Sequence, residues 1–408
     1  MQKIPILYRY IFREVLIVFS ICLFVFTGIL FLIRSLKLLD MVINKDVPLL
    51  DIILLFSYII PRFLEIAIPM SLLLALILAF GRLSADSELV VVKASGISIH
   101  RLVIPVFAFA GLCTGLTFAV AMIIRPYATY QLNIGMFQIA KNKATSGLVA
   151  GIFNELSSLT MYAQDINYET KRMDNVIIAD RQDEKNPRTF LAKNGHLLAD
   201  NAARSLFIRL YNGSIQEGFG KSLRYTTFDV NNINIDQDTL SDDDPLRGGK
   251  RTREMYLHEL NNSIHSLRGK GELEEEERQQ LGRYLSEFHY RFALPLSCLC
   301  VALVAMALGI QPARGSKQWG MTANIIVGIS LIFVFYILMA VADAIAAQGN
   351  YPAWALIWIP DLLFALLAGY LYRQICAERW VTASDVFVLP IQGGLAKLGL
   401  LSPEKKDA

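Results

Sequence analysis

Two charged residues, Arg62 and Glu65, lie three positions apart inside a long apolar run. This spacing places both side chains on one face of a helix. If the run crosses a bilayer, the two charges are costly there and must face the interior of a helix bundle or a water-filled path. They can form a structural ion pair, or they can line a substrate cavity or gate. Asp343 and Asp361, in two later apolar runs, are further possible partners for a buried cation.

Arg34 and Lys37 repeat the same spacing near the end of the first apolar run. Two cations held on one helix face at headgroup level suit the phosphate groups of a lipid. The plainer interpretation is that both are anchors, whose long side chains reach from a helix end toward water. Phosphate binding is favoured, because positive charge on this side of a membrane runs against the usual orientation rule.

The polar stretch of residues 81–98, GRLSADSELVVVKASGIS, separates the second and third apolar runs and contains four consecutive apolar residues. It predicts a helix of about residues 85–95, within a segment of about 84–96. Ser84 is expected to be its N-cap, with Asp86 in the first turn, and Gly96 is expected to follow its last turn. By helical spacing, one face is predicted to carry Glu88, Val91, Val92 and Ser95.

An isolated helix of three turns is marginal in water, so this segment is expected to pack between the helix bundle and something else. Lying on a lipid surface is one alternative, but such helices prefer Lys and Arg on the polar face and Trp or Phe at the boundary. This segment has an acid and only Lys93 there. Docking to a cytoplasmic partner is therefore the favoured interpretation.

The composition indicates a membrane protein without catalytic machinery. Of the 408 residues, 54% are hydrophobic and 18% are charged, whereas soluble domains contain about 25% charged residues. The cysteines lie in or next to apolar runs, which argues against a disulfide framework or a cysteine metal site. The histidines show no metal spacing, and the phosphate-binding motif GxxxxGKS/T does not occur. We expect no catalytic residues, no metal and no cofactor, so any ATP hydrolysis must come from a separate subunit.

Three apolar runs of spanning length come first, at about 14–36, 52–80 and 101–124, and three come last, at about 291–311, 321–346 and 353–373. Each is near the ~20 residues that cross a hydrocarbon core. The expected fold is an α+β membrane protein with six transmembrane helices (3 + 3) and one large domain between helices 3 and 4. The predicted organisation is transmembrane helices 1–3 over 1–124, the large domain over 125–290, transmembrane helices 4–6 over 291–375 and a cytoplasmic tail over 376–408.

Short alternating runs separated by Asn-Gly and other turn signals fill much of the large domain. Regular strand-and-turn spacing predicts a β-sandwich or β-jellyroll over about 144–236. Residues 127–143 can continue the third helix outward, and 236–249 are expected to be a loop. The segment of about 253–287 is expected to be a helical return. Its run of glutamates is expected to be a solvated face with ion pairs rather than a cation site.

Lysine and arginine residues near the span ends predict the orientation. They gather at the N-terminus, in the 81–98 stretch, in the loop after the fourth run and after the sixth run, whereas residues 346–352 have none. Both termini are therefore predicted to be cytoplasmic. The domain of residues 125–290 is predicted to face the periplasm, on the outer side of a bacterial inner (cytoplasmic) membrane.

The order and spacing of several segments resemble the LptF/LptG family of lipopolysaccharide-export permeases across nearly the whole chain. The matching segments are residues 8–14 (YRYIFRE), 45–48 (KDVP), 68–73 (IPMSLL), 81–96 (GRLSADSELVVVKASG) and 287–295 (EFHYRFALP). Residues 256–260 (YLHEL) are more similar to the LptF-type subunit, whereas SELVV at 87–91 is closer to LptG-type members. The resemblance favours the LptF type.

This resemblance implies a permease subunit of an ATP-driven ABC transporter that extracts lipopolysaccharide from the inner membrane. Such permeases pair with an LptG-like paralogue, bind an LptB-like ATPase dimer, and pass the lipid through a periplasmic β-jellyroll to a bridge of LptC- and LptA-like proteins. The helix of the 81–98 stretch would be the coupling helix, and Glu88 the acid that enters the ATPase groove. Arg34 and Lys37 match basic positions that meet lipopolysaccharide, and Arg62 and Glu65 are candidates for lining its path.

Two other functions fit the same topology. A mechanotransmission membrane subunit would transport nothing and would not need the cations at positions 34 and 37. An ion-coupled secondary carrier would need intramembrane acids such as Glu65 and Asp361 and would work without an ATPase. The helix expected between the second and third runs argues against a secondary carrier.

Overall fold

The computed structural model describes residues 5–42, 48–146, 148–156, 159–167, 170–180, 188–200, 205–218, 224–235, 250–271, 273–310 and 319–377. The chain divides into two compact units. The first, called here the helical unit, contains residues 1–34, 60–126 and 255–408, and the second, the sheet unit, contains residues 35–59 and 127–254. Each unit has its own hydrophobic core.

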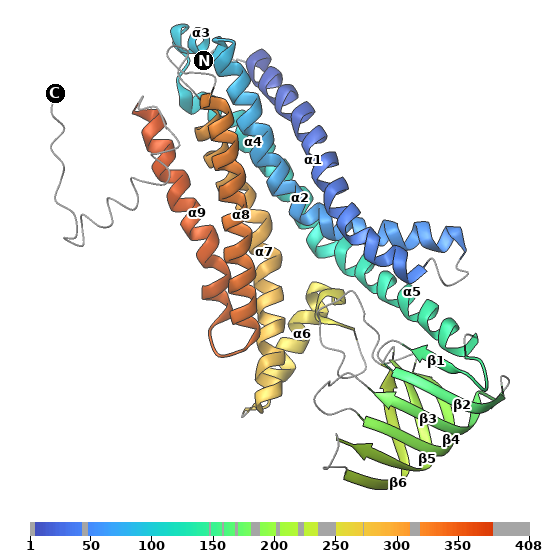
Figure 1. Ribbon diagram of the computed structural model, residues 1–408. Coiled ribbons are helices and arrows are strands. Elements are labelled where there is room, and N and C mark those ends of the chain that lie inside the picture. Colours follow the sequence, from blue (N-terminus) through green and yellow to red (C-terminus); the bar gives the residue numbers. More distant parts are fainter. Residues whose placement is uncertain are drawn as a thin grey trace. The chain divides into compact units, whose positions relative to one another are not determined.

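Long helices confirm the predicted 3 + 3 arrangement, and Figure 1 shows their order along the chain. In the described part of the chain, 6 helices are long and apolar enough to cross a membrane. They are α1 (Pro5–Val42), α2 (Leu49–Ala85), the continuous segment that begins with α4 (Ile99–Ala119), α7 (Glu275–Gly309), α8 (Trp319–Ala347) and α9 (Ala353–Cys376). A short helix, α3 (Glu88–Ala94), connects α2 to α4. Together with the strands below, these helices confirm the α+β membrane fold.

The third spanning helix continues well past its apolar run. From α4 the chain passes through a π-helical turn at Val120–Ile124 into α5 (Arg125–Ser146). The backbone N–H of Arg125 bonds to the carbonyl of Val120, five residues earlier. Pro126 has no N–H, and its ring would crowd a carbonyl in a regular helix, so the wider turn accommodates it. The prediction that residues 127–143 extend this helix is confirmed.

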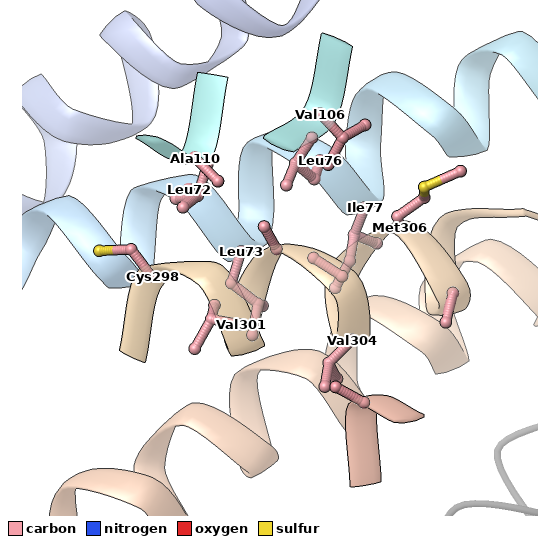
Figure 2. Packing of buried hydrophobic residues seen from close by; sticks show 14 of the residues in the cluster. Leu72, Leu73, Leu76, Ile77, Val106, Ala110, Cys298, Val301, Val304 and Met306 are labelled. Carbon is pink, nitrogen blue, oxygen red and sulfur yellow. The ribbon is translucent and has the colours of Figure 1, made fainter. Parts of the chain in front are cut away.

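The core of the helical unit lies where α2, α4 and α7 meet. Figure 2 shows part of this packing, with residues of α2 (Leu72, Leu73, Leu76 and Ile77), α4 (Val106 and Ala110) and α7 (Cys298, Val301, Val304 and Met306). Small residues on α7 let its backbone approach α2 closely. A Cβ added to Gly309 would lie 2.7 Å from the Cβ of Phe80 and 3.1 Å from the carbonyl oxygens of Leu76 and Ile77.

The sheet unit contains one antiparallel sheet of 6 strands in the order β1-β2-β3-β4-β5-β6. The strands are β1 (Phe153–Leu156), β2 (Leu159–Asn167), β3 (Arg172–Asp180), β4 (Arg188–Asp200), β5 (Ser205–Glu217) and β6 (Arg224–Ile235). Each strand pairs with its sequence neighbours, which makes the described sheet a meander. A jelly roll in the strict sense has two sheets and Greek-key connections, so the described sheet has a simpler topology than predicted. Short connections between consecutive strands explain the difference, because they favour hairpin pairing. The Asn-Gly pairs at 194–195 and 212–213, which were expected to be turns, lie inside β4 and β5.

One face of this sheet is apolar and buried. Met161 and Ala163 of β2, Val176 and Ile178 of β3 and Ile208 of β5 are almost completely inaccessible to solvent. Phe137 of α5 packs into the same cluster. The opposite face is more polar, so the sheet shows the alternation expected of antiparallel strands with one covered side.

The helical return consists of a 3-10 turn at Thr252–Glu254, the helix α6 (Leu257–Arg268) and the start of α7. A capping box begins α6: the Glu259 carboxylate accepts the backbone N–H of Tyr256 at 2.8 Å. Glutamates fill the first turn of α7, where negative charge suits the helix dipole, and Glu277 pairs with Lys270 at 2.7 Å. The expected loop at 236–249, Glu272 of the acidic run and the expected tail beyond residue 377 lie outside the described residues.

The close approach of α7 to α2 makes a stability prediction. Gly309→Ala should lower the free energy of unfolding by about 1–3 kcal/mol, because the added Cβ overlaps Phe80 and two backbone carbonyls. Gly111→Ala on α4 is the matched control, since nothing lies within 4 Å of its Cβ position. Thermal unfolding of the purified protein in detergent measures both, and equal melting temperatures for the two variants would contradict the packing.

Candidate functional site

The helix α3 begins later than the sequence predicts. Ser84 belongs to the last turn of α2, where it is buried, and its hydroxyl donates to the carbonyl of Phe80 at 2.8 Å. It therefore does not cap α3, and the expected N-cap at Ser84 is wrong. The residue before the helix is Ser87, in the left-handed backbone region with φ 58°. The helix contains 7 residues, Glu88–Ala94, which makes it shorter than expected.

The end of α3 has the geometry that Gly96 predicts. Gly96 has φ 80°, a conformation that glycine adopts without the steric cost of a side chain. Its N–H bonds to the carbonyl of Lys93 at 2.9 Å, and the N–H of Ile97 bonds to the carbonyl of Val92 at 3.3 Å. This pair of bonds is a Schellman motif, so it fixes the direction in which the chain leaves α3 toward α4.

Val91 and Val92 were expected on one face of the helix, but in the structure they lie on opposite sides of α3. Leu89 is buried, and Val92 packs against the same core cluster. Val90 and Val91 point the other way, with 46% and 67% of their surfaces exposed. The Ser95 hydroxyl donates to the carbonyl of Val92 at 2.8 Å. Thus α3 is held to the helical unit on one side and presents two adjacent valines to solvent on the other.

The carboxylate of Glu88 has a partner on the first helix. Tyr10 of α1 donates its hydroxyl to the two carboxylate oxygens, at 3.0 and 3.2 Å. Four residues further along α1, Glu14 pairs with Arg82 of α2 at 2.7 Å. The same guanidinium lies 3.7 Å from Asp86, which is exposed in the turn before α3. Two polar contacts therefore join the start of α1 to the α2–α3 corner.

A second group of charges is buried among the long helices. Arg125, at the start of α5, reaches Glu65 on α2 at 3.1 Å and both carboxylate oxygens of Glu287 on α7 at 2.9 and 3.1 Å. Arg291 donates its Nε to Glu287 at 2.7 Å and one Nη to the carbonyl of Met255 at 2.8 Å. All four charged side chains are buried. With two positive and two negative groups, the network is balanced in charge, and it joins three membrane-length helices.

The network corrects one sequence expectation. Arg62 is the ion-pair partner that helical spacing offers to Glu65, but Glu65 forms its ion pair with Arg125. Arg62 is half-buried on α2 and contacts neighbouring groups. In the sequence, Arg125 is only the first residue of the domain expected at 125–290. A sequence signal did exist, because Glu287 and Arg291 are spaced i, i+4 at the start of an apolar run.

The other charged candidates are Arg34, Lys37, Asp343 and Asp361. Arg34 is half-buried on α1 and contacts neighbouring groups, whereas the side chain of Lys37 lies outside the described residues. Asp343 of α8 accepts a hydrogen bond from Ser286 of α7. Asp361 of α9 is buried, and neither of its carboxylate oxygens has a hydrogen-bond partner in the part of the chain that the structure describes.

No metal centre is formed by the residues that the structure describes. Among them, no group of three or more His, Cys, Asp or Glu side chains is placed to hold an ion. What the described residues form is charge pairing inside the helical unit and an exposed apolar and acidic surface on α3.

Removing Arg125 tests the buried network. In Arg125→Met, two buried carboxylates lose their shared cation, and the free energy of unfolding should fall by about 3–5 kcal/mol. Arg172→Met is the control, because that arginine forms a half-exposed pair with Asp174 in the sheet unit and should contribute about 1 kcal/mol or less. Thermal unfolding in detergent compares the two, and an equally small loss in both would show that the buried network is not required.

Comparison with known proteins identifies the family. The family described as lipopolysaccharide export system permease LptF/LptG matches residues 9–374. The chain is 22% identical over 370 residues to the lipopolysaccharide export system permease protein LptF of Escherichia coli strain K12, covering 89% of this chain and 93% of that protein. It is 25% identical over 314 residues to the uncharacterized protein RP871 of Rickettsia prowazekii, covering 76% and 84% of the two chains. This chain therefore belongs to the LptF/LptG family of lipopolysaccharide export permeases.

Proposed function

We propose that this chain is the LptF-type permease subunit of an ATP-driven transporter in a bacterial inner membrane. In this proposal it pairs with an LptG-like paralogue and is energised by an LptB-like ATPase dimer. The observation that carries the proposal is α3, which is fixed at both ends and exposes Val90 and Val91 next to Glu88. An exposed apolar pair beside an acid is suited to a partner surface that has a groove and a basic group.

Glu88 is the residue on which docking of the ATPase should depend most. Its carboxylate is half-buried. In the described part of the chain, it accepts hydrogen bonds only from the neutral hydroxyl of Tyr10. A basic group on the ATPase would form a stronger, charge-assisted bond with it. Asp86, Val91 and Ser95 lie on the exposed part of the same corner, whereas Val92 would act from beneath by holding the helix in place.

The cargo in this proposal is lipopolysaccharide, taken from the outer leaflet of the inner membrane. The outer part of α1 exposes large apolar side chains, among them Phe24, Leu32 and Ile33, as a helix that borders lipid or a partner subunit would. Arg34 follows this stretch and is placed to meet a phosphate, together with Lys37 one turn further along the sequence. Closing of the ATPase dimer would shift α3, move the spanning helices and expel the lipid from the cavity between the paired subunits.

The sheet unit is proposed to receive the lipid on the periplasmic side, with both chain termini in the cytoplasm. The outermost strands of the described sheet are β1 and β6. Edge strands can pair with strands of another β protein, which is how LptC- and LptA-like proteins would extend the path toward the outer membrane.

One observation favours a different class of function. Asp361 is a buried acid without a hydrogen-bond partner in the described chain, and an ion-coupled carrier needs such a group. The presence of α3 argues for an ATPase-driven permease instead, because a carrier has no use for a docking helix. A mechanotransmission subunit would keep α3 but would bind no lipid.

Co-purification separates these functions. The chain should be expressed with its LptG-like partner and LptB-like ATPase, and retained ATPase and bound lipopolysaccharide should both be quantified. Glu88→Arg should remove most of the ATPase, because it places a cation against a basic groove. Glu275→Arg is the matched control, since Glu275 is also an acid at the first position of a helix.

The two readouts have different meanings. ATPase that stays bound to the Glu88→Arg protein would exclude α3 as the docking helix. Bound ATPase without any lipopolysaccharide would favour mechanotransmission. A separate transport assay without the ATPase tests the ion-coupled carrier, which would be favoured if transport survives there and is lost in Asp361→Asn.

A further inference from the structure

The sheet unit has a crease that crosses four of its strands. Inward-facing residues are two positions apart along most of each strand, but across the crease they are three apart: Ala163 to Ile166 on β2 and Met173 to Val176 on β3. The strand pairing stays in register on both sides. The alternation of side chains is therefore shifted by one residue at the same place in neighbouring strands.

Four polar residues form the row at which this shift occurs: Gln164, Asn175, Lys193 and Asn212. Asn175 and Asn212 have φ of 49° and 52°, a left-handed conformation that asparagine tolerates better than most residues but that is uncommon within strands. The side-chain amide of Asn175 donates to Gln164 at 2.7 Å. All four side chains are exposed on the face opposite the apolar core. Residues held in such sparsely populated conformations gather at ligand sites.

A hollow of about 560 Å³ lies over this row. Its size falls within the ~300–1,000 Å³ of small-molecule sites. Half-buried Ile177 and Leu191 contribute to its lining, together with Tyr162 of β2 and Tyr225 of β6. The ring of Tyr162 packs against Phe153 at a centroid distance of 5.3 Å, whereas Tyr225 is 62% exposed. The hollow is therefore bounded by aromatic rings and by amides, with a lysine beside them.

The side chains around this hollow match the surface of a sugar. A pyranose ring has faces rich in C–H groups and edges rich in hydroxyls. The negative face of a tyrosine ring attracts C–H groups, and a carboxamide offers a donor and an acceptor to adjacent hydroxyls. The ammonium group of Lys193 adds three donors. An acyl chain would leave these polar groups without hydrogen-bond partners, so the hollow suits a sugar better than a lipid chain.

The spacing of the strands indicates more than one sugar ring. Tyr162 lies on β2 and Tyr225 on β6, four strand positions apart. At about 4.8 Å between strands, the two tyrosines are separated by ~19 Å across the strands. This is longer than a single ring, so the ligand should be an oligosaccharide lying across the strands.

We propose that this hollow binds the oligosaccharide part of the glycolipid that the permease exports. The choice of this cargo rests on the proposed function, but the hollow and its sugar-binding side chains do not.

The test uses the full chain purified in detergent and, as the probe, core oligosaccharide freed from lipid A by mild acid hydrolysis of lipopolysaccharide. Saturation-transfer NMR and calorimetry should show saturable binding to the wild type. Tyr162→Ala and Tyr225→Ala should each weaken binding by about tenfold, and Lys193→Gln should weaken it by a smaller factor. Tyr351→Ala, an exposed tyrosine between α8 and α9, should bind as the wild type does.

Folding is checked by the melting temperature of each variant, and Tyr225 and Lys193 are exposed enough that their replacement should leave it unchanged. Absence of saturable binding, or binding that both Tyr225→Ala and Lys193→Gln leave unaltered, would overturn the proposed site.

Intact lipopolysaccharide retained during purification is measured in parallel. Retention without oligosaccharide binding would overturn the site and leave the proposed function standing. Oligosaccharide binding without retention would support the site and count against the proposed cargo.

Discussion

Two arginines and two glutamates, buried among helices that are apolar enough to cross a membrane, form the contact on which the helical unit depends most. A charge in such surroundings is tolerated only when it is paired and hydrogen-bonded. Arg125 meets this condition by binding Glu65 and Glu287 together, and Arg291 supplies the second cation. Because the partners come from α2, α5 and α7, no one of these helices can move away alone without exposing an uncompensated charge. The network therefore makes α2, the third spanning helix and α7 behave as one block.

In the proposed permease, the block and the small-residue packing of α7 would give α3 and α1 different roles. The corner of α2 and α3 continues directly from the block, and Leu89 and Val92 fasten α3 to the same core. A force applied to Val90, Val91 or Glu88 would thus reach α2 and α7 without passing through a loop. By contrast, α1 is buried along one stripe, at Ile11, Val15, Phe19 and Cys22, and exposes much of its remaining surface. Its polar contacts with Arg82 and Glu88 lie at the start of the helix.

Much of this architecture could be predicted from the sequence, because long apolar runs and alternating strands are local patterns. The capping glycine after α3 was predictable for the same reason, since Gly96 acts within its own turn. The network was not, because Arg125 is 60 residues from Glu65 and 162 from Glu287, and nothing local indicates which distant helices meet. The start of α3 was mispredicted because Ser84 can form either a cap or a bond within α2, and burial against α7 decides between them. The crease in the sheet was equally hidden, since Asn175 and Asn212 read as ordinary turn formers in isolation.

A double-mutant cycle on Glu65 and Arg125 tests most directly whether charge balance holds the block together. Arg125→Met, Glu65→Gln and the double variant would be compared by thermal unfolding in the same detergent. Charge balance predicts that the double variant is more stable than Arg125→Met alone, because Glu287 then keeps Arg291 as its own counter-charge. Losses that simply add in the double variant would contradict this role and would reduce the network to independent contacts.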